Sequence, residues 1–150
     1  MQQPTRFKVR TYAIFIEDQK ILVSKEFHHG LDLFKLPGGG VELGESLEEA
    51  VLREIEEELS IQAQHVDHAF TFTGFIQNQF NPADQVIGVY FIARADAAAL
   101  EKINAEQHNP KGGSGELQQR LWLTFDEAVE AMSFDMDRIA LAEVIKKARN

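Results

Sequence analysis

Acidic side chains crowd the stretch GGGVELGESLEEAVLREIEEELSI, residues 38–61, in which Arg53 is the only cation. On a helix with 100° between residues, Glu54, Glu57 and Glu58 lie within about a third of the circumference. Two carboxylates about 5 Å apart at an effective dielectric of about 20 repel by roughly 3 kcal/mol. If this face lines a cleft, it therefore requires a divalent cation or carboxyl groups with raised pKa values. Hard oxygen ligands, without cysteine or clustered histidine, favour Mg²⁺ or Mn²⁺.

A solvated surface is the alternative interpretation of these glutamates. Glutamate-rich helices are usually exposed, and the charge spacing alone favours that interpretation. The preceding residues LPGGGVELGE, 36–45, favour a site instead. They place flexible backbone directly before the helix, where carbonyl groups can coordinate a metal ion and free N–H groups can meet a phosphate.

The stretch resembles the signature of the Nudix hydrolases, G-x5-E-x7-R-E-U-x-E-E-x-G-U, where U is an aliphatic residue. Every specified position but one matches at the right spacing. The exception is Ser60, where the family has a glycine that ends the helix in a left-handed conformation. Serine there costs about 1 kcal/mol of backbone strain or requires a different cap. The matching positions are Gly39, Glu45, Arg53, Glu54, Ile55, Glu57, Glu58 and Ile61.

This resemblance implies a hydrolase that cleaves the diphosphate linkage of a nucleoside diphosphate joined to another moiety. Water attacks a phosphorus of the diphosphate, while Mg²⁺ or Mn²⁺ ions screen negative charge and lower the pKa of bound water. Carried over to this chain, the resemblance makes Glu54 and Glu58 the principal metal ligands and Glu57 a further ligand, directly or through water. Gly38 and Gly39 belong to the cofactor-binding loop, with the Gly38 carbonyl as a backbone ligand.

The supporting residues and the general base are expected from the same resemblance. Arg53 and Glu45 support the site, with Arg53 orienting one of the acidic side chains. Members of the family differ in the general base: some use a signature glutamate, and others a carboxylate on a later mobile loop. Glu116 is the downstream candidate, because it follows the glycine-rich residues PKGGSG, which could swing it over the site. The alternative is an exposed acid in a flexible loop.

The strands that must position these residues are predicted by their apolar, β-branched character. Residues 28–34 are expected to be a loop. Residues 7–18 and 20–27 are expected to form a hairpin across Asp18 and Gln19. Residues 61–75 and 85–95 are expected to pair with each other. The predicted strands are residues 7–18, 20–27, 61–75, 85–95 and 117–124.

The helices are predicted by their capping signals and apolar periodicity. Ser46 and Glu49 form a capping box at the start of the glutamate-rich helix, and Thr124 and Glu127 form a second one. The expected helices cover residues 46–59, 96–105, 125–132 and 135–150. This interleaving predicts the α/β class, with a mixed sheet covered by helices in a single domain over residues 1–150. The Nudix resemblance implies the same architecture, an α/β/α sandwich.

The apolar stripes of two helices are expected to pack on the sheet. Arg53 lies on the remaining side of the first helix, within reach of Glu49 and Glu57. The stripe of the first helix is Val51, Leu52, Ile55 and Leu59. The stripe of the last helix is Ile139, Ala142, Val144 and Ile145.

The composition excludes several classes of protein. The net charge of −9 comes without an evident basic patch, which argues against a nucleic-acid partner. The chain has no cysteine, so disulfides, thiolate zinc sites and a cysteine nucleophile are excluded. No apolar run approaches the roughly 18 residues of a membrane span, and the first residues have no apolar signal region. A cytoplasmic protein without a membrane partner is the expectation.

The sequence does not determine the substrate. Family marks for ADP-ribose and dinucleoside polyphosphate enzymes, a proline or a tyrosine downstream of the signature, are absent at residues 77–79. A small-molecule nucleotide or nucleotide sugar remains. The rival hypothesis is a non-catalytic Nudix-fold module for ligand binding or interaction, which the retained glutamates disfavour. The oligomeric state is not determined, although family members often pair and a homodimer is therefore an open alternative.

Other residues have ordinary structural explanations on sequence alone. Two cations that could offset substrate charge and two adjacent histidines are expected to be solvated. A tryptophan is expected in the core, and stacking of two phenylalanines on a base is the less favoured interpretation. The cations are Arg10 and Lys35, the histidines are His28 and His29, the tryptophan is Trp122, and the phenylalanines are Phe75 and Phe80.

Overall fold

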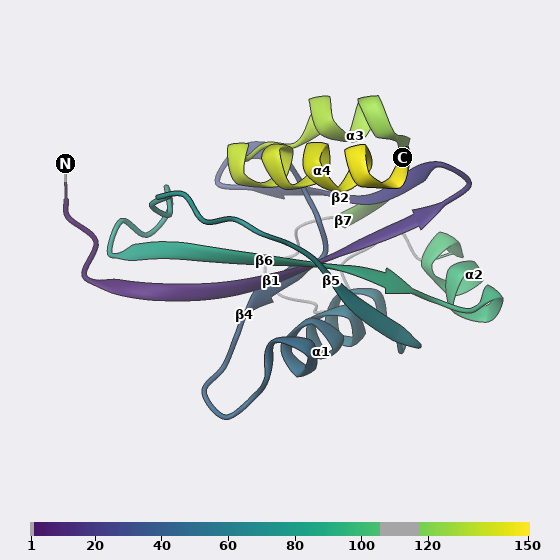
Figure 1. Cartoon of the computed structure of the whole chain (residues 1–150), viewed down its shortest axis with the longest axis horizontal. Coiled ribbons are helices and arrows are strands. Elements are labelled where there is room, and N and C mark those ends of the chain that lie inside the picture. Colours follow the sequence, from purple (N-terminus) through teal and green to yellow (C-terminus); the bar gives the residue numbers. More distant parts are fainter. Residues whose placement is uncertain (1, 106–117) are drawn as a thin grey trace.

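The computed structural model describes residues 2–105 and 118–150. These residues form a mixed seven-stranded sheet with helices on both faces (Figure 1). The strands are β1 (Arg6–Glu17), β2 (Lys20–His28), β3 (Leu31–Lys35), β4 (Gly38–Gly40), β5 (His65–Thr71), β6 (Asp84–Arg94) and β7 (Gln118–Thr124). The helices are α1 (Leu47–Leu59), α2 (Ala97–Ala105), α3 (Phe125–Ala131) and α4 (Asp135–Ala148).

The long strand β1 organises the sheet. The strand order is β3-β2-β1-β6-β5, with β4 paired to β1 and β7 paired to β2. β1 and β6 run parallel, and the other strand pairs are antiparallel. β4 lies against the middle of β1, where Gly38 is opposite Tyr12 and Gly40 is opposite Arg10. The glycine-rich loop is therefore fixed to the centre of the sheet.

Helix α1 covers one face of the sheet, and α3 and α4 cover the other (Figure 1). Side chains alternate along β1, so Ala13 and Phe15 pack in the cluster that contains α1. Tyr12 and Ile14 point the opposite way, into the cluster that contains α3 and α4. The predicted α/β class and the α/β/α sandwich are confirmed.

The prediction of a loop over residues 28–34 was wrong, because β3 pairs antiparallel with β2 there. His29 and Gly30 form the turn, with φ of 52° and 76°. A two-residue turn with both φ angles positive suits the right-handed twist of the flanking strands. Leu33 is buried, which gives this short strand a core face.

The apolar stripes of α1 and α4 are displaced from the predicted ones. Leu52 is 36% exposed, whereas Ala50 and Glu54 on the other edge of the stripe are buried. The buried arc of α1 is rotated towards this edge because the edge packs against the glycines of β4.

In α4 the predicted positions Ile139 and Ala142 are exposed, so that part of the prediction was wrong. Val144 and Ile145 are buried as predicted. The observed stripe uses two adjacent positions in each turn and turns the predicted pair towards solvent. It consists of Met136, Asp137, Ala140, Leu141, Val144 and Ile145.

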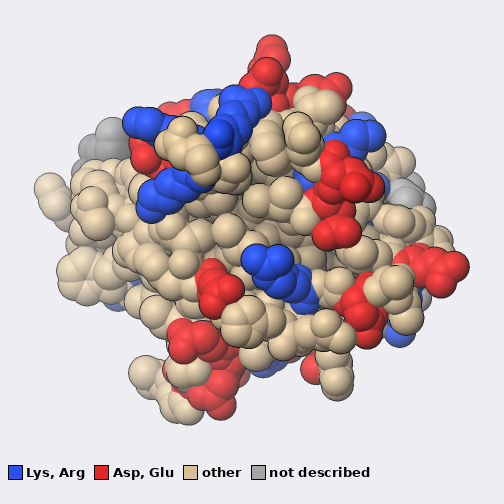
Figure 2. All heavy atoms as spheres, turned by 45° about the vertical axis from the view of Figure 1, so that its right-hand side comes forward, with Lys and Arg blue, Asp and Glu red and all other residues tan. Residues whose placement is uncertain are grey.

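The surface drawn in Figure 2 carries Lys and Arg side chains in separate groups that alternate with groups of Asp and Glu. Among the helices of the described residues, none combines the length and the apolar character required to cross a membrane.

Candidate active site

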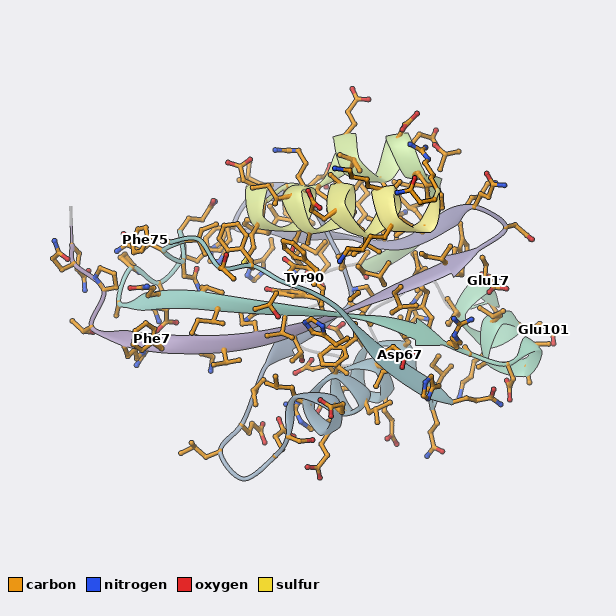
Figure 3. The ribbon with its side chains drawn as sticks, in the orientation of Figure 1. Phe7, Glu17, Asp67, Phe75, Tyr90 and Glu101 are labelled. Carbon is orange, nitrogen blue, oxygen red and sulfur yellow. The ribbon has the colours of Figure 1, made fainter. Side chains whose placement is uncertain are left out.

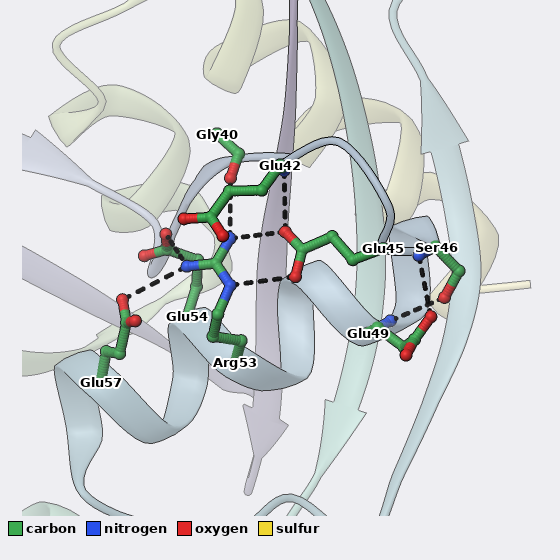
Figure 4. A network of polar contacts seen from close by, with 8 residues as sticks. All are labelled: Gly40, Glu42, Glu45, Ser46, Glu49, Arg53, Glu54 and Glu57. Atoms are coloured by element: carbon green, nitrogen blue, oxygen red, sulfur yellow. Dashed lines mark hydrogen bonds and ion pairs between the residues drawn. The ribbon is translucent and has the colours of Figure 1, made fainter.

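Helix α1 begins at Ser46 through both hydrogen bonds of the predicted capping box. The Ser46 hydroxyl accepts from the Glu49 backbone N–H at 3.0 Å, and the Glu49 carboxylate accepts from the Ser46 N–H at 2.9 Å (Figure 4). Such a box satisfies two backbone donors that the first helical turn leaves unpaired. It sets where the helix starts, and so determines which side chains face β4.

Arg53 lies at the centre of a polar network that joins the helix to the loop before it (Figure 4). Its guanidinium donates to both carboxylate oxygens of Glu45, at 2.7 and 3.0 Å. It also donates to Glu54 at 2.9 Å, to Glu57 at 3.3 Å and to the Gly40 carbonyl at 2.9 Å. Arg53 therefore holds three signature carboxylates, those of Glu45, Glu54 and Glu57, by direct contact. Glu49, also within its predicted reach, caps the helix instead.

The charges in this network stabilise one another. The hydrogen bonds from Arg53 lower the pKa of Glu45 to about 2, and the bonds to Glu45 raise the pKa of Arg53. Bidentate pairing of a guanidinium with a carboxylate has fixed geometry as well as charge attraction. The loop residue Glu45 thereby holds Arg53 in the orientation that contacts Glu54 and Glu57.

The glycines of β4 lie directly against the signature carboxylates. Glu54 is 7% exposed, and a Cβ added at Gly39 would come within 2.5 Å of its carboxylate carbon. The Gly38 N–H donates to a carboxylate oxygen of Glu58 at 2.9 Å. Only a residue without a side chain at position 39 leaves room for the Glu54 carboxylate.

The predicted metal ligands are brought to one region but hold protein partners there. Among the described residues, no three His, Cys, Asp or Glu side chains are grouped closely enough to hold a metal ion. Arg53 contacts Glu54 and Glu57, while Glu58 contacts Gly38. The donors are hard oxygens, with no cysteine in the chain, which suits Mg²⁺ or Mn²⁺. The ligand set Glu54, Glu57, Glu58 and the Gly38 carbonyl stays a prediction, and the general-base candidate Glu116 lies outside the described residues.

Two adjoining hollows open next to the glycine loop. The smaller hollow is lined by Gly38 and Glu58 together with residues of β1, β2 and α4. The larger one has a volume of about 430 Å³ and is lined by Phe80, His28 and His29 among others. The lining residues that the two hollows share are Arg10, Tyr12, Lys35 and Asp137.

Several residues that sequence alone left on the surface thus line the larger hollow. Arg10 and Lys35 are only partly exposed there, and Phe80 stacks on His29 with ring centroids 4.4 Å apart. Phe75 is 64% exposed and does not line this hollow. Trp122, predicted in the core, is partly buried and packs against the core cluster on the α1 side.

A buried polar chain beneath the hollow was not predicted. The Tyr90 hydroxyl donates to Asp137 at 2.6 Å, and Arg10 donates to the Tyr12 hydroxyl at 2.8 Å. The rings of Tyr12 and Tyr90 stack at 4.9 Å, and Tyr90 lies between the sheet and α4 (Figure 3). Burial raises the pKa of Asp137 to about 6 and that of Tyr12 to about 12. One sequence signal was available: Asp137 interrupts the apolar stripe of α4.

We expect Asp137→Asn to stabilise the protein at neutral pH. The folded state binds the Asp137 proton more tightly than the unfolded chain does. Protonation of Asp137 therefore stabilises the folded state fully below pH 3.8, and this stabilisation is lost as pH rises towards about 6. The loss is on the order of 3 kcal/mol. The asparagine carbonyl can still accept from Tyr90.

Urea unfolding of both proteins at pH 4, 6 and 7.5 measures this difference. The advantage of the variant should be largest at pH 7.5 and should nearly vanish at pH 4. An advantage that does not change with pH would contradict the role of this carboxyl group.

Helix α1 ends in the left-handed conformation that the family glycine would adopt. Ser60 has φ 57° and ψ 34°, and its N–H donates to the Glu56 carbonyl at 2.9 Å. The first of the two predicted outcomes, the same cap with backbone strain, therefore applies. We expect Ser60→Gly to raise the free energy of unfolding by about 0.5–1 kcal/mol, because relief of strain outweighs the added freedom of the unfolded chain.

Calorimetry should then show a rise in Tm of about 2 °C for Ser60→Gly. Ser60→Ala is the control, since alanine retains the strain and should bring no gain. Equal Tm values for the glycine and alanine variants would show that the left-handed backbone costs nothing here.

Comparisons with known proteins agree with this architecture. A family model described as NUDIX domain matches residues 6–146. The 8-oxo-dGTP diphosphatase of Escherichia coli (strain K12) is 29% identical over 99 residues, covering 66% of this chain and 67% of that protein. The NAD-capped RNA hydrolase NudC of Photorhabdus laumondii subsp. laumondii is 28% identical over 110 residues, covering 73% of this chain and only 36% of that protein. The crystal structure of the MutT protein from Methanosarcina mazei Go1 matches with a TM-score of 0.72 at 18% identity, covering 100% and 99% of the two chains. That structural likeness concerns the fold.

Proposed function

The chain belongs to the NUDIX domain family and is a Nudix pyrophosphohydrolase, and from this premise we propose that it uses divalent metal ions to cleave a nucleoside diphosphate joined to another moiety. The bond broken is the diphosphate linkage, and a small-molecule nucleotide or nucleotide sugar is the substrate. The names of two relatives, an 8-oxo-dGTP diphosphatase and an NAD-capped RNA hydrolase, support a nucleotide as the common part of the substrate.

The lining that the two hollows have in common is the observation that carries this proposal. Glu58 and Gly38 line the smaller hollow, which has four of its described lining residues in common with the larger one. A volume of about 430 Å³ lies within the range of roughly 300–1,000 Å³ that is typical of small-molecule sites. A substrate whose diphosphate lies at Glu58 would have its nucleoside in the larger hollow.

The charges along this path suit a diphosphate. Within the described part of the chain, the Lys and Arg side chains that line both hollows are Arg10 and Lys35. Lys35 also pairs with Glu26 at 2.5 Å, which holds its ammonium group near the smaller hollow. These two cations would bind the negative oxygens between the carboxylates and the nucleoside. The ring of Phe80, at the larger hollow, would pack against the base.

In the reaction, Glu54, Glu57, Glu58 and the Gly38 carbonyl would hold the Mg²⁺ or Mn²⁺ ions. Bound divalent ions supply charge screening of the diphosphate and a lowered pKa for the attacking water. Arg53 orients Glu54 and Glu57 through its hydrogen bonds. A signature glutamate or Glu116 would accept the proton of the water.

Hydrolysis of a nucleotide panel tests the proposal. Purified protein with Mg²⁺ is incubated with nucleoside triphosphates, nucleotide sugars and dinucleotides, and the products are separated by ion-exchange chromatography. We expect at least one substrate to be cleaved at its diphosphate and the reaction to stop when EDTA removes the metal. Nucleotide binding without turnover on the whole panel would favour the non-catalytic module. A cytoplasmic location, a homodimer and a single domain over residues 1–150 remain predictions.

A further inference from the structure

Arg120 is a charged residue buried far from the signature in sequence. It lies in β7, opposite Ser24 of β2, and is 4% exposed. A guanidinium removed from water loses several kcal/mol of hydration unless protein acceptors replace the water. The acceptors near Arg120 therefore indicate why a cation is placed there.

Its guanidinium donates to carbonyl groups at the ends of two helices. One bond goes to the Glu58 carbonyl in the last turn of α1 at 2.7 Å, and another to the Ile103 carbonyl in the last turn of α2 at 3.4 Å. The last carbonyls of a helix have no partner within the helix and carry the negative end of its dipole. Arg120 thus supplies a positive charge to the ends of both helices.

Helix α1 has particular need of this cation. Its last turn contains no basic residue, and acidic side chains precede its end. At that end Ser60 occupies the left-handed position. A cation from another part of the chain offsets the charge that α1 itself leaves uncompensated.

Glu58 is consequently held both through its backbone and through its side chain. Its backbone carbonyl accepts from Arg120, and its carboxylate accepts from the Gly38 N–H at 2.9 Å. A shift of the last turn of α1 would move the carboxylate away from the glycine loop. We propose that Arg120 is a positioning residue of the active site, which sets the place of the Glu58 carboxylate for metal binding by fixing the last turn of α1.

This inference rests on the proposed function, because it assumes that Glu58 binds the metal ion. Mn²⁺ alone is the probe, and free Mn²⁺ is measured by electron paramagnetic resonance at a temperature well below the Tm of every variant. We expect Arg120→Met to weaken Mn²⁺ binding about 10- to 100-fold, as loss of a residue that orients a metal ligand does. Arg120→Lys keeps the charge but not the forked geometry, and should weaken it about 3- to 10-fold.

Arg138 offers a matched control. Its guanidinium also donates to carbonyl groups at the end of a helix, those of Val129 and Met132 at α3, and it lines neither hollow. We expect Arg138→Met to lower Tm without changing Mn²⁺ affinity. In kinetics, Arg120→Met should raise the half-saturating Mg²⁺ concentration and lower kcat more than it changes the KM for nucleotide.

The outcomes separate this inference from the proposed function. If Glu58→Gln leaves Mn²⁺ affinity unchanged, the metal site itself is elsewhere and both proposals fail. If Glu58→Gln weakens binding while folded Arg120→Met binds Mn²⁺ within twofold of the original protein, only the positioning role is overturned. Should Arg120→Met not fold, Arg120→Lys decides in the same way: unchanged Mn²⁺ affinity overturns the role, and weaker binding supports it.

Discussion

Glu58→Gln is expected to lower kcat on the order of 10³-fold with Mg²⁺, while the protein stays folded. The amide has the shape of the carboxylate, and its oxygen can still accept from the Gly38 N–H that now donates to Glu58 at 2.9 Å. Only the negative charge is removed. Because the negatively charged carboxylate is the proposed metal ligand, the variant should also lose most of its Mn²⁺ affinity.

Steady-state kinetics on the best substrate of the panel, with Mg²⁺ varied, measures this effect. Glu56→Gln is the matched control, because Glu56 is an exposed glutamate of the same helix at an unspecified position of the signature. It should change kcat by less than about twofold. Turnover of Glu58→Gln equal to that of Glu56→Gln would refute a metal-binding role for Glu58.

The second large effect is expected from Gly39→Ala. The added Cβ would lie 2.5 Å from the carboxylate carbon of Glu54 and 2.5 and 2.7 Å from its oxygens. The Glu54 side chain must then move, although Arg53 holds it at 2.9 Å. We expect kcat to fall by about 10²-fold, since displacement of a reacting group by about 1 Å has effects of that size.

Gly40→Ala is the neighbouring control for this change. A Cβ at Gly40 would meet the end of the flexible Lys8 side chain, at 2.9 and 3.1 Å, and that side chain can move aside. Circular dichroism and Tm should show both alanine variants folded, with activity lost in Gly39→Ala alone. Similar activity in the two variants would mean that the contact between residue 39 and Glu54 is not required for catalysis.

Features with a local physical cause could be predicted from the sequence. The capping box at Ser46 depends on residues three apart, and the hairpin at Asp18 and Gln19 depends on a two-residue turn; both are confirmed. The left-handed end of α1 at Ser60 is likewise a local backbone requirement. Strand β3, by contrast, has no such local cause. Its five residues are too short to carry a clear periodic signal, and their strand character comes from pairing with β2.

The sequence by itself therefore determined the signature, its position at the start and along one face of a helix, and the class of fold. The signature depends on spacing along a short stretch of chain, and the class of fold depends on the order in which strands and helices follow one another. Only the tertiary structure decided what those residues touch. Arg10, Lys35 and Asp137 come from β1, β3 and α4, yet line one path to Glu58. Arg120 reaches the end of α1 from β7. Contacts of this kind depend on how the sheet brings distant segments together, and no periodicity within a segment encodes that arrangement.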